Sequence, residues 1–224
     1  MPVTLSDIRD RVRVMADQKD VNFIEDSELL PFIDQSWAEL YDIMIKTFED
    51  YYLTSSPATV ATNASSIPLP SDFYKLRGLD YDNGSGDYTD VERYNFNERN
   101  RKNLASYRND WSDSPVRYRL QGNTIKLTPT DQAAGNYQVW YYPVRTPLVN
   151  DSDVIDVISG FEEYIVIDAS IKIKQSAEED IRPLQLAKDD MRKRLEAMSA
   201  NRDAAKPQTI TRSRSISSRN GWRW

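Results

Sequence analysis

The sequence predicts an α+β protein: a helical bundle with an inserted small antiparallel β domain and an extended C-terminal arm. Residues 4–48 and 159–201 repeat apolar side chains at helical spacing. Between these segments the period shortens and turn residues multiply, which is typical of short strands. After Pro207 no helical period is left. The predicted divisions are therefore 1–50, 51–153, 154–206 and 207–224.

The stretch from Ser159 to Asn201 predicts two consecutive helices. Ser159 and Glu162 match the capping box S-x-x-E, in which each side chain bonds a free amide of the first turn. A wide apolar stripe follows and predicts a helix buried against others. This stripe consists of Phe161, Tyr164, Ile165, Ile167, Ala169, Ile171 and Ile173. Pro183 cannot lie deep inside a helix, so a second helix restarts there. Its narrower stripe is Leu184, Ala187, Met191, Leu195 and Met198.

Two further helices are predicted before residue 51. Thr4 and Asp7 approximate a capping box for the first helix, which we expect to end near Asp17. Its apolar face is Leu5, Ile8, Val12 and Met15, and Arg9, Arg11 and Arg13 are interpreted as a solvated face. The second helix begins near Asp26 or Ser27 and tolerates Pro31 only near its start. Its aromatic stripe, expected to pack on residues 161–176, is Leu30, Ile33, Trp37, Leu40, Tyr41, Met44 and Phe48.

The middle of the chain predicts short strands. Residues 51–54 and 74–81 are expected to be strands, whereas 55–66, rich in Ser, Thr, Ala and Asn, is expected to be an exposed loop. Residues 67–73 predict an extended entry followed by a tight turn. The clearest hairpin pairs 116–121 with 124–128 around Gly122-Asn123, with Val116, Tyr118 and Leu120 on its buried face. Residues 135–142 predict one more strand.

Several charged clusters in this middle region need an interpretation. Residues 80–87 fail the EF-hand pattern, because Gly84 stands where a ligand is needed, so a hairpin tip is favoured over a calcium site. Asp151 and Asp153 are interpreted as loop acids, because no third ligand stands at useful spacing. A basic patch is formed by Arg99, Arg101, Lys102 and Arg108. It could contact a neighbouring subunit or phosphates, although a solvated face is favoured.

Composition excludes several kinds of chemistry. The 224 residues include no Cys and no His, which excludes disulfides, thiolate catalysis, zinc–sulfur sites and imidazole-based triads. No metal, cofactor or catalytic residue is therefore expected. The sequence has no apolar run long enough for a membrane span and no apolar signal region at its N-terminus, so a cytoplasmic product is expected.

The C-terminal arm is basic, whereas the rest of the chain is acidic. Net charge is −6, yet residues 206–224 hold five cations and no acid, which leaves −11 on residues 1–205. The arm is low in complexity and ends in Gly-Trp-Arg-Trp, and Trp and Arg are the residue types that dominate binding hot spots. We therefore expect it to fold on a partner. The candidate docking residues are Ile210, Arg212, Arg214, Ile216, Arg219, Trp222, Arg223 and Trp224.

Three segments together resemble the head-to-tail adaptor, or connector, proteins of tailed bacteriophages, particularly short-tailed ones. They are TLSDIRDRVRVMADQKDVNFIEDSELLPFIDQSWAELYDIMI, IPLPSDFYKLRGLDY and SGFEEYIVIDASIKIK. The resemblance spans about residues 1–200 and implies a helical bundle with inserted β structure. It also implies a twelve-fold ring beneath the portal, and in some members a C-terminal extension climbs onto the portal.

The leading hypothesis is a structural virion protein at the head–tail junction, assembled in the host cytoplasm. It would bind the portal through the arm, a tail nozzle or other tail protein, and its own copies, and packaged DNA would pass without specific binding. An acidic channel wall would keep DNA from sticking. One alternative is a nucleic-acid-binding protein whose basic tail grips phosphates while Trp222 and Trp224 stack on bases. Another is a carboxylate-based cell-wall hydrolase, although no acid lies in a catalytic motif.

Overall fold

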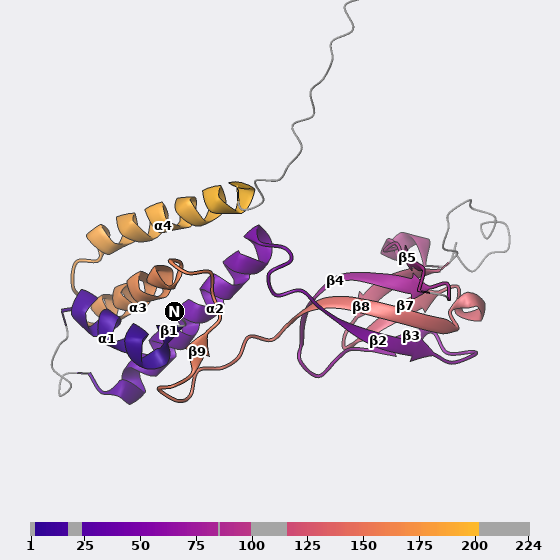
Figure 1. Cartoon of the computed structure of the whole chain (residues 1–224), viewed down its shortest axis with the longest axis horizontal. Helices are drawn as coiled ribbons and strands as arrows, with labels where there is room; N and C mark the ends of the chain where they lie inside the picture. The colour runs from indigo at the N-terminus through magenta and orange to yellow at the C-terminus, as the bar shows by residue number, and fades with distance from the viewer. Residues whose placement is uncertain (1–2, 18–23, 85, 100–115, 202–224) are drawn as a thin grey trace, which may run out of the picture.

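The computed structural model of the chain describes residues 3–17, 24–84, 86–99 and 116–201. Within them, helices gather at one end of an elongated molecule and most strands at the other (Figure 1). The four described α-helices are α1 (Leu5–Met15), α2 (Asp26–Thr47), α3 (Glu162–Ser176) and α4 (Arg182–Asn201). The described strands pair in an antiparallel manner. The α+β class predicted from the sequence is confirmed.

Helix α3 lies at the centre of the helical end and packs against the other three helices. Its residues from Tyr164 to Ile171 are all buried, so it is apolar nearly all round rather than on one stripe. The predicted packing of α2 on α3 is confirmed. The apolar core of this end combines residues from α1, α2, α3 and α4, including Ile8, Val12, Leu29, Ile33, Leu40, Met44, Phe161, Ile165, Ile173 and Leu195.

Three of the four predicted helix starts agree with the structure, including the start of α2 at Asp26. Thr4 caps α1 with the predicted box, its hydroxyl accepting from the Asp7 amide at 3.2 Å. Pro183 is the second residue of α4, where its missing amide costs nothing. The predicted box of Ser159 and Glu162 is wrong. Phe161 is the N-cap, and the Glu162 carboxylate accepts from the Gly160 amide instead, because Gly160 has a φ of 95° and turns the chain before the helix.

The described strands form three sheets. A four-stranded sheet has the order β2-β8-β4-β5, a three-stranded sheet the order β3-β7-β6, and β1 pairs with β9. Their bounds are β1 Val3–Thr4, β2 Thr54–Val60, β3 Ser66–Pro68, β4 Phe73–Asp82, β5 Tyr88–Asp90, β6 Arg117–Gln121, β7 Thr124–Thr128, β8 Gly135–Pro143 and β9 Val154–Ile155. Two single 3₁₀ turns, η1 (Phe96–Glu98) and η4 (Thr130–Gln132), flank β6 and β7 in the chain.

The two larger sheets share one apolar core. The chain after β5 connects them, because the Val91 amide donates to the Leu79 carbonyl of β4 while the Tyr118 amide of β6 donates to the Glu92 carbonyl. Side chains from both sheets then fill the space between, namely Val60, Ile67, Leu79, Val91, Val116, Ile125, Leu127, Ala133, Tyr137, Val139 and Tyr141. This core is separate from the core of the helical end.

Most of the predicted strands are confirmed, with two corrections. Residues 54–60, which were expected to lie mainly in an exposed loop, form strand β2. The predicted strand at 51–54 overlaps β2 only at Thr54, the first residue of β2. Pro57 is tolerated there because β2 is an edge strand. In the 116–128 hairpin Val116 is buried as predicted, but Leu120 is 41% exposed. Ile125 and Leu127 of β7 fill the core in its place.

The β4–β5 turn lies where the sequence predicts it. The Asn83 amide donates to the Asp87 carbonyl at 2.9 Å and closes the β4–β5 hairpin, while the Gly84 amide donates to Asp82. The predicted hairpin tip is therefore confirmed. Gly135, where β8 begins, has a φ of 149°, and a Cβ built there would lie 2.6 Å from the Tyr81 ring. Glycine is required at this position by both its backbone and its neighbour.

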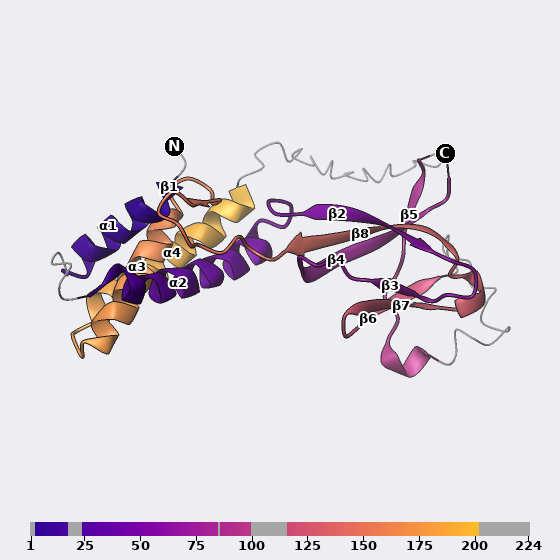
Figure 2. The ribbon, with the colours of Figure 1, turned by 90° about the horizontal axis from the view of Figure 1, so that it is seen from below.

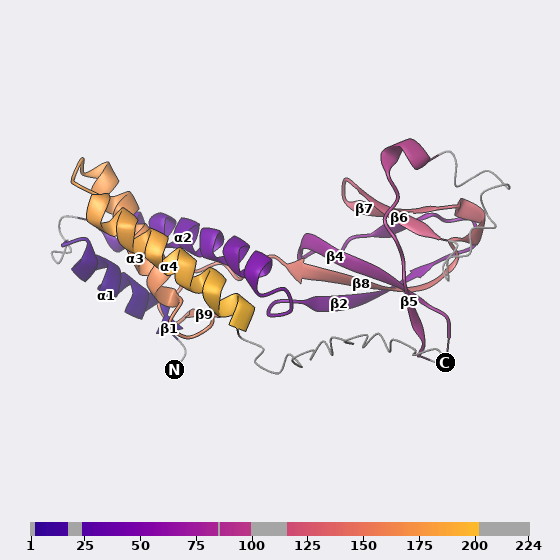
Figure 3. The ribbon, with the colours of Figure 1, turned by 90° about the horizontal axis from the view of Figure 1, so that it is seen from above.

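Tyrosines and ion pairs connect the helical end to the strand end, and we call this set of contacts the joint. The Tyr41 hydroxyl of α2 donates to the Pro143 carbonyl at 2.6 Å, and the Tyr142 hydroxyl of β8 donates to the Glu49 carbonyl at 2.7 Å. Arg145 pairs through both terminal nitrogens with the Asp34 carboxylate, each at 2.6 Å. The helices and β8 meet here (Figures 2 and 3), so the two ends are fixed to each other at several separate points.

Candidate functional site

The predicted docking arm lies outside the described residues. This applies to Ile210, Arg212, Arg214, Ile216, Arg219, Trp222, Arg223 and Trp224. Of the predicted basic patch, only Arg99 is described. What the structure does place is α4, whose last residue, Asn201, precedes the arm in the chain. The way α4 is held on the other helices therefore decides how firmly the arm is connected to the protein.

A cluster of charged side chains between α2, α3 and α4 fixes α4 in place. Asp168 of α3 is only 3% exposed and accepts from two lysines. Lys172 Nζ lies 2.6 Å from Asp168 Oδ2, and Lys188 Nζ of α4 lies 2.8 Å from Asp168 Oδ1. Lys188 also binds both carboxylate oxygens of Glu39 of α2, at 2.9 and 3.2 Å. One ammonium therefore bridges three helices.

Hydroxyl groups complete this cluster. Ser36 of α2 is fully buried and its Oγ accepts from Lys172 at 3.0 Å, while its own hydroxyl donates to the Phe32 carbonyl. The Tyr164 hydroxyl of α3 donates to Glu39 at 2.7 Å. Buried charges are tolerated only when they are paired and hydrogen-bonded, and here both the carboxylate and the ammonium groups are.

The pKa shifts of Asp168 and Lys188 favour the charged form of both groups. Burial alone would raise the pKa of Asp168, but hydrogen bonds from Lys172 and Lys188 outweigh it, and the pKa is lowered. Burial alone would lower the pKa of Lys188, but the Asp168 and Glu39 carboxylates outweigh it, and the pKa is raised. Burial raises the pKa of the Tyr164 hydroxyl, with Glu39 adding to the effect. These shifts move each group away from neutral pH, which suits a structural contact better than proton transfer.

One signal for this cluster can be recognised in the sequence. Asp168 and Lys172 stand four residues apart within an otherwise apolar helix, and opposite charges at that spacing lie on one helix face. Lys188 lies 20 residues from Asp168 in the chain. Its role follows from the position of α4 and could not be found by spacing within one helix.

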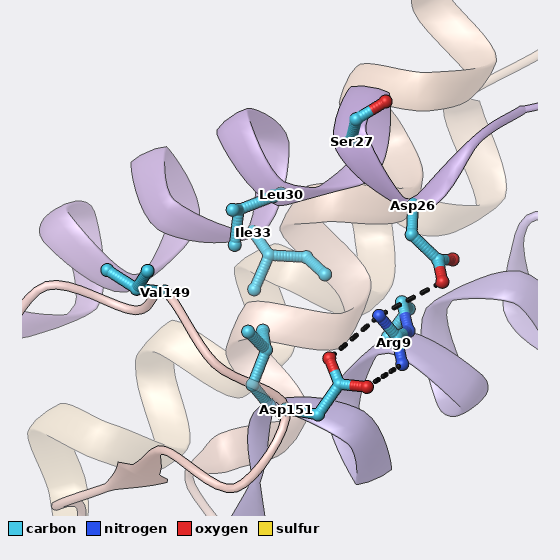
Figure 4. A pocket seen from close by; sticks show the side chains of 8 residues that line it. Arg9, Asp26, Ser27, Leu30, Ile33, Val149 and Asp151 are labelled. Carbon is cyan, nitrogen blue, oxygen red and sulfur yellow. Dashed lines mark hydrogen bonds and ion pairs between the residues drawn. The ribbon is translucent and has the colours of Figure 1, made fainter.

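A second charged cluster connects α1 to the start of α2 and to the loop before β9 (Figure 4). Arg9 donates through both terminal nitrogens to Asp151, at 3.0 and 2.9 Å, and pairs with Asp26 at 3.1 Å. The hydrogen bond to Asp151 is the largest cause of the raised pKa of Arg9. The cluster borders a cavity of about 190 Å³ lined also by Leu5, Ser27, Leu30, Ile33 and Val149.

The interpretation of the α1 arginines as a solvated face is wrong. Arg13 is only 7% exposed and donates to the Ile24 carbonyl at 2.8 Å and to Asp26 at 2.6 Å. Arg11 pairs with Glu163 of α3. Each of these arginines forms an ion pair with a carboxylate of another part of the chain. Their charges therefore stabilise the packing of α1 rather than a solvent-exposed face. The long aliphatic stem of arginine lets it reach a carboxylate from a mostly apolar helix face.

The loop acids also have specific partners. Asp151 pairs with Arg9, and Asp153 accepts from the Val149 and Asn150 amides, both at 2.8 Å. The hydrogen bonds from these two backbone amides are the largest cause of the lowered pKa of Asp153. Among the described residues no group of three or more acidic, Cys or His side chains could hold a metal ion. In the same part of the chain no helix is long and apolar enough to span a membrane.

The carboxylates with several close contacts therefore hold elements together, and the arrangement resembles a scaffold for interactions more than a reaction centre. Comparison with known proteins agrees with this. No curated protein matches the sequence. The model of the SU10 adaptor protein family, however, matches residues 3–216, nearly the whole chain. The resemblance to phage head-to-tail adaptors is thereby confirmed, and the chain belongs to the SU10 adaptor protein family.

Proposed function

We propose that this protein joins the portal to the tail of the phage particle and continues the DNA channel as a twelve-fold ring. The family match over residues 3–216 is the observation that carries this proposal. The portal is the partner above the ring, and a tail protein is the partner below it. DNA passes through the ring without sequence-specific contacts, and the net charge of −11 on residues 1–205 is suited to that role.

We further propose that residues 207–224 dock on the portal as an extended arm. The support is chemical: this segment combines four arginines with two terminal tryptophans in a stretch that has no helical period. The arm follows α4, which Lys188 fastens to both α2 and α3. Pairing of many arms with one portal ring would make the assembly tight even where each arm binds modestly.

The domain division belongs to the same proposal. Residues 1–50 and 154–206 would form one helical bundle, and 51–153 would form a β domain inserted between its halves. Two separate apolar cores support this division. Because exposed connections are cut faster than packed cores, limited proteolysis followed by mass spectrometry should release fragments that end near residues 51 and 153.

The test of the proposed function is co-sedimentation with the portal ring of the same phage. The full chain is compared with a chain truncated after Lys206, which keeps all of α4. If only the full chain sediments with the portal, the arm is the docking element. Equal binding of both chains would assign docking to the body and refute the role of the arm. If neither binds, the adaptor role itself is refuted.

A further inference from the structure

An exposed phenylalanine flanked by arginines lies on the strand end of the molecule. Phe96 of η1 is 54% exposed. The Arg99 guanidinium carbon lies 3.9 Å from the centre of its ring, and that of Arg119 of β6 lies 4.9 Å from it. The stacked Arg119 guanidinium is held in place by the ring while its N–H edge stays available to a carboxylate. Such an arrangement is prepared for an anionic partner, because less side-chain entropy is lost on binding.

Among the described residues, the side chains around Phe96 carry more positive than negative charge. Arg119 stands directly opposite Lys126 of β7, a like-charge pair that destabilises the sheet. The acids Glu92 and Glu98 already have partners: Glu92 is paired with Arg117, and Glu98 accepts from the Asn95 amide. Within the described part of the chain neither Arg119 nor Lys126 forms an ion pair, and as direct cross-strand neighbours they lie on the same side of the sheet. We call Phe96, Arg119 and Lys126 the basic face.

The β4–β5 hairpin carries the opposite charge. Residues 78–92 contain five acids and no base. Asp80 stands directly opposite Asp90, again a like-charge pair that costs stability within one chain. Asp87 and Asp90 are exposed and form no ion pair among the described residues, and Tyr88 between them is 54% exposed. An exposed tyrosine flanked by carboxylates matches a phenylalanine flanked by arginines in both charge and aromatic character.

The hairpin and the basic face lie on opposite sides of the strands. In Figures 2 and 3 the β4–β5 hairpin projects to one side, while η1, the magenta turn beside β6, projects to the other. One chain therefore cannot bring its own hairpin to its own basic face. Two copies can do so, and each copy then still offers one free surface of each kind. Contacts of this head-to-tail type generate closed rings when the rotation between copies fits.

We propose that the β4–β5 hairpin of one copy docks on the basic face of the next, with Asp87 and Asp90 pairing with Arg119 and Lys126, and Tyr88 packing near Phe96. This assignment rests on the proposed ring and names the surfaces that would close it. A second copy fits the basic face better than DNA does, because residues 1–205 carry −11 overall and would repel a polyanion at long range. The repulsion within each like-charge pair would be relieved at every contact around the ring.

Charge reversal on the two surfaces gives a direct test. The full-length variants D87R/D90R and R119D/K126D are each added to the portal ring, and the copies retained per portal are counted by native mass spectrometry. In each variant alone the two surfaces carry the same sign, so we expect retention to fall about tenfold or more. An equimolar mixture of the two variants pairs opposite signs at every contact and should restore retention to near the parent level. Failure of the mixture to exceed the single variants would overturn the proposal.

A matched control separates this effect from net charge. D189R/D190R changes the charge by the same amount as D87R/D90R, but on exposed positions of α4, and should be retained like the parent chain. Equal loss in this control would overturn the assignment to the hairpin. If R119D/K126D assembles fully but releases a double-stranded DNA fragment that the parent retains, the basic face binds DNA and the proposal is also overturned.

Disulfide trapping tests the contact without relying on the portal. Because the sequence contains no Cys, the double variant D90C/R119C can cross-link only through the two introduced thiols. With the portal, or at high concentration without it, mild oxidation should give a ladder of covalent oligomers. D190C/R119C should not give one. No ladder in either condition would refute the contact. A portal that binds the chain without a ladder refutes the contact alone, whereas a ladder without portal binding refutes the adaptor role alone.

Discussion

At Asp168, two lysines from different helices reach one nearly inaccessible carboxylate. Its neighbours in α3, Ile167 and Ala169, are apolar and buried, so helices α3 and α4 could have been joined by apolar contacts alone. Apolar replacement of a buried ion pair is often neutral or stabilising, which suggests that the charges contribute specificity as well as energy. Lys188 can satisfy Asp168 and Glu39 together only in one rotation and one register of α4.

Removing the Asp168 carboxylate should destabilise the protein strongly. Asp168→Ala leaves Lys172 and Lys188 without their shared partner, and we expect the free energy of unfolding to fall by about 3 kcal/mol. Urea denaturation measures this change. Asp190→Ala, which removes an exposed carboxylate from α4, should change stability by less than about 0.5 kcal/mol. An equal decrease in the free energy of unfolding in the two variants would show that the Asp168 carboxylate stabilises the protein no more than an exposed carboxylate does.

The lowered pKa of Asp168 also predicts how the free energy of unfolding changes with pH. The folded pKa of Asp168 is lowered, so its contribution is present above the unfolded value of about 3.9 and is lost as pH falls through the folded pKa. The stability difference between the parent and Asp168→Asn should therefore be widest near neutral pH and should shrink in acid below about pH 4. Urea denaturation over a series of pH values measures it. A difference that widens in acid would contradict the lowered pKa.

At the scale of elements, the sequence predicted the helices better than the strands. Thr4, Asp7 and Pro183 act at helix ends through backbone chemistry that is local, so they could be read directly. The Ser159 box failed because the φ of Gly160 sets the chain direction there. Residues 54–60 have the composition of a loop and become a strand only because β8 supplies a partner far along the chain. Such pairing is invisible to local patterns.

Gly135 is the first residue of β8, and the requirement for glycine at this position can be measured. In Gly135→Ala the new methyl group would meet the Tyr81 ring at 2.6 Å in a backbone conformation that side chains rarely adopt. We expect the free energy of unfolding to fall by about 2 kcal/mol. Gly78→Ala on β4, where nothing lies within 4 Å, is the matched control and should change stability by less than about 1 kcal/mol. Thermal denaturation compares the two, and an unchanged midpoint for Gly135→Ala would contradict the steric argument.

At the scale of the whole molecule, the sequence predicted the α+β class and the family but not how surfaces meet. The Asp168 cluster joins residues from three helices, and Arg9 meets Asp151 across 142 positions of sequence. Residue spacing carries no information about such contacts until the packing of the helices is known. The docking residues of the arm stay a prediction, because they lie outside the residues that the structure describes.

The arm prediction can be tested with the whole chain. In the double variant W222A/W224A the two large apolar side chains at the terminus are removed, and we expect portal binding to weaken by at least about 30-fold if they act as hot-spot residues. Surface plasmon resonance on immobilised portal measures the affinity. Leu186→Ala, which removes an exposed apolar side chain from α4, should bind like the parent. Unchanged affinity in W222A/W224A would assign docking to other residues.

The joint has a mechanical consequence for a molecule built in this way. Tyr41 of α2 donates to the Pro143 carbonyl, Tyr142 of β8 donates to the Glu49 carbonyl, and Arg145 pairs with Asp34 of α2. Hydrogen-bond donors on both sides of the joint therefore connect the two ends. A single connection would act as a swivel, whereas several separate attachments resist twisting as well as bending. In a ring of such subunits, a rotation imposed on one rim would be transmitted to the other with little lost as internal strain. The protein would then behave as a torsionally stiff coupling between whatever is attached above and below.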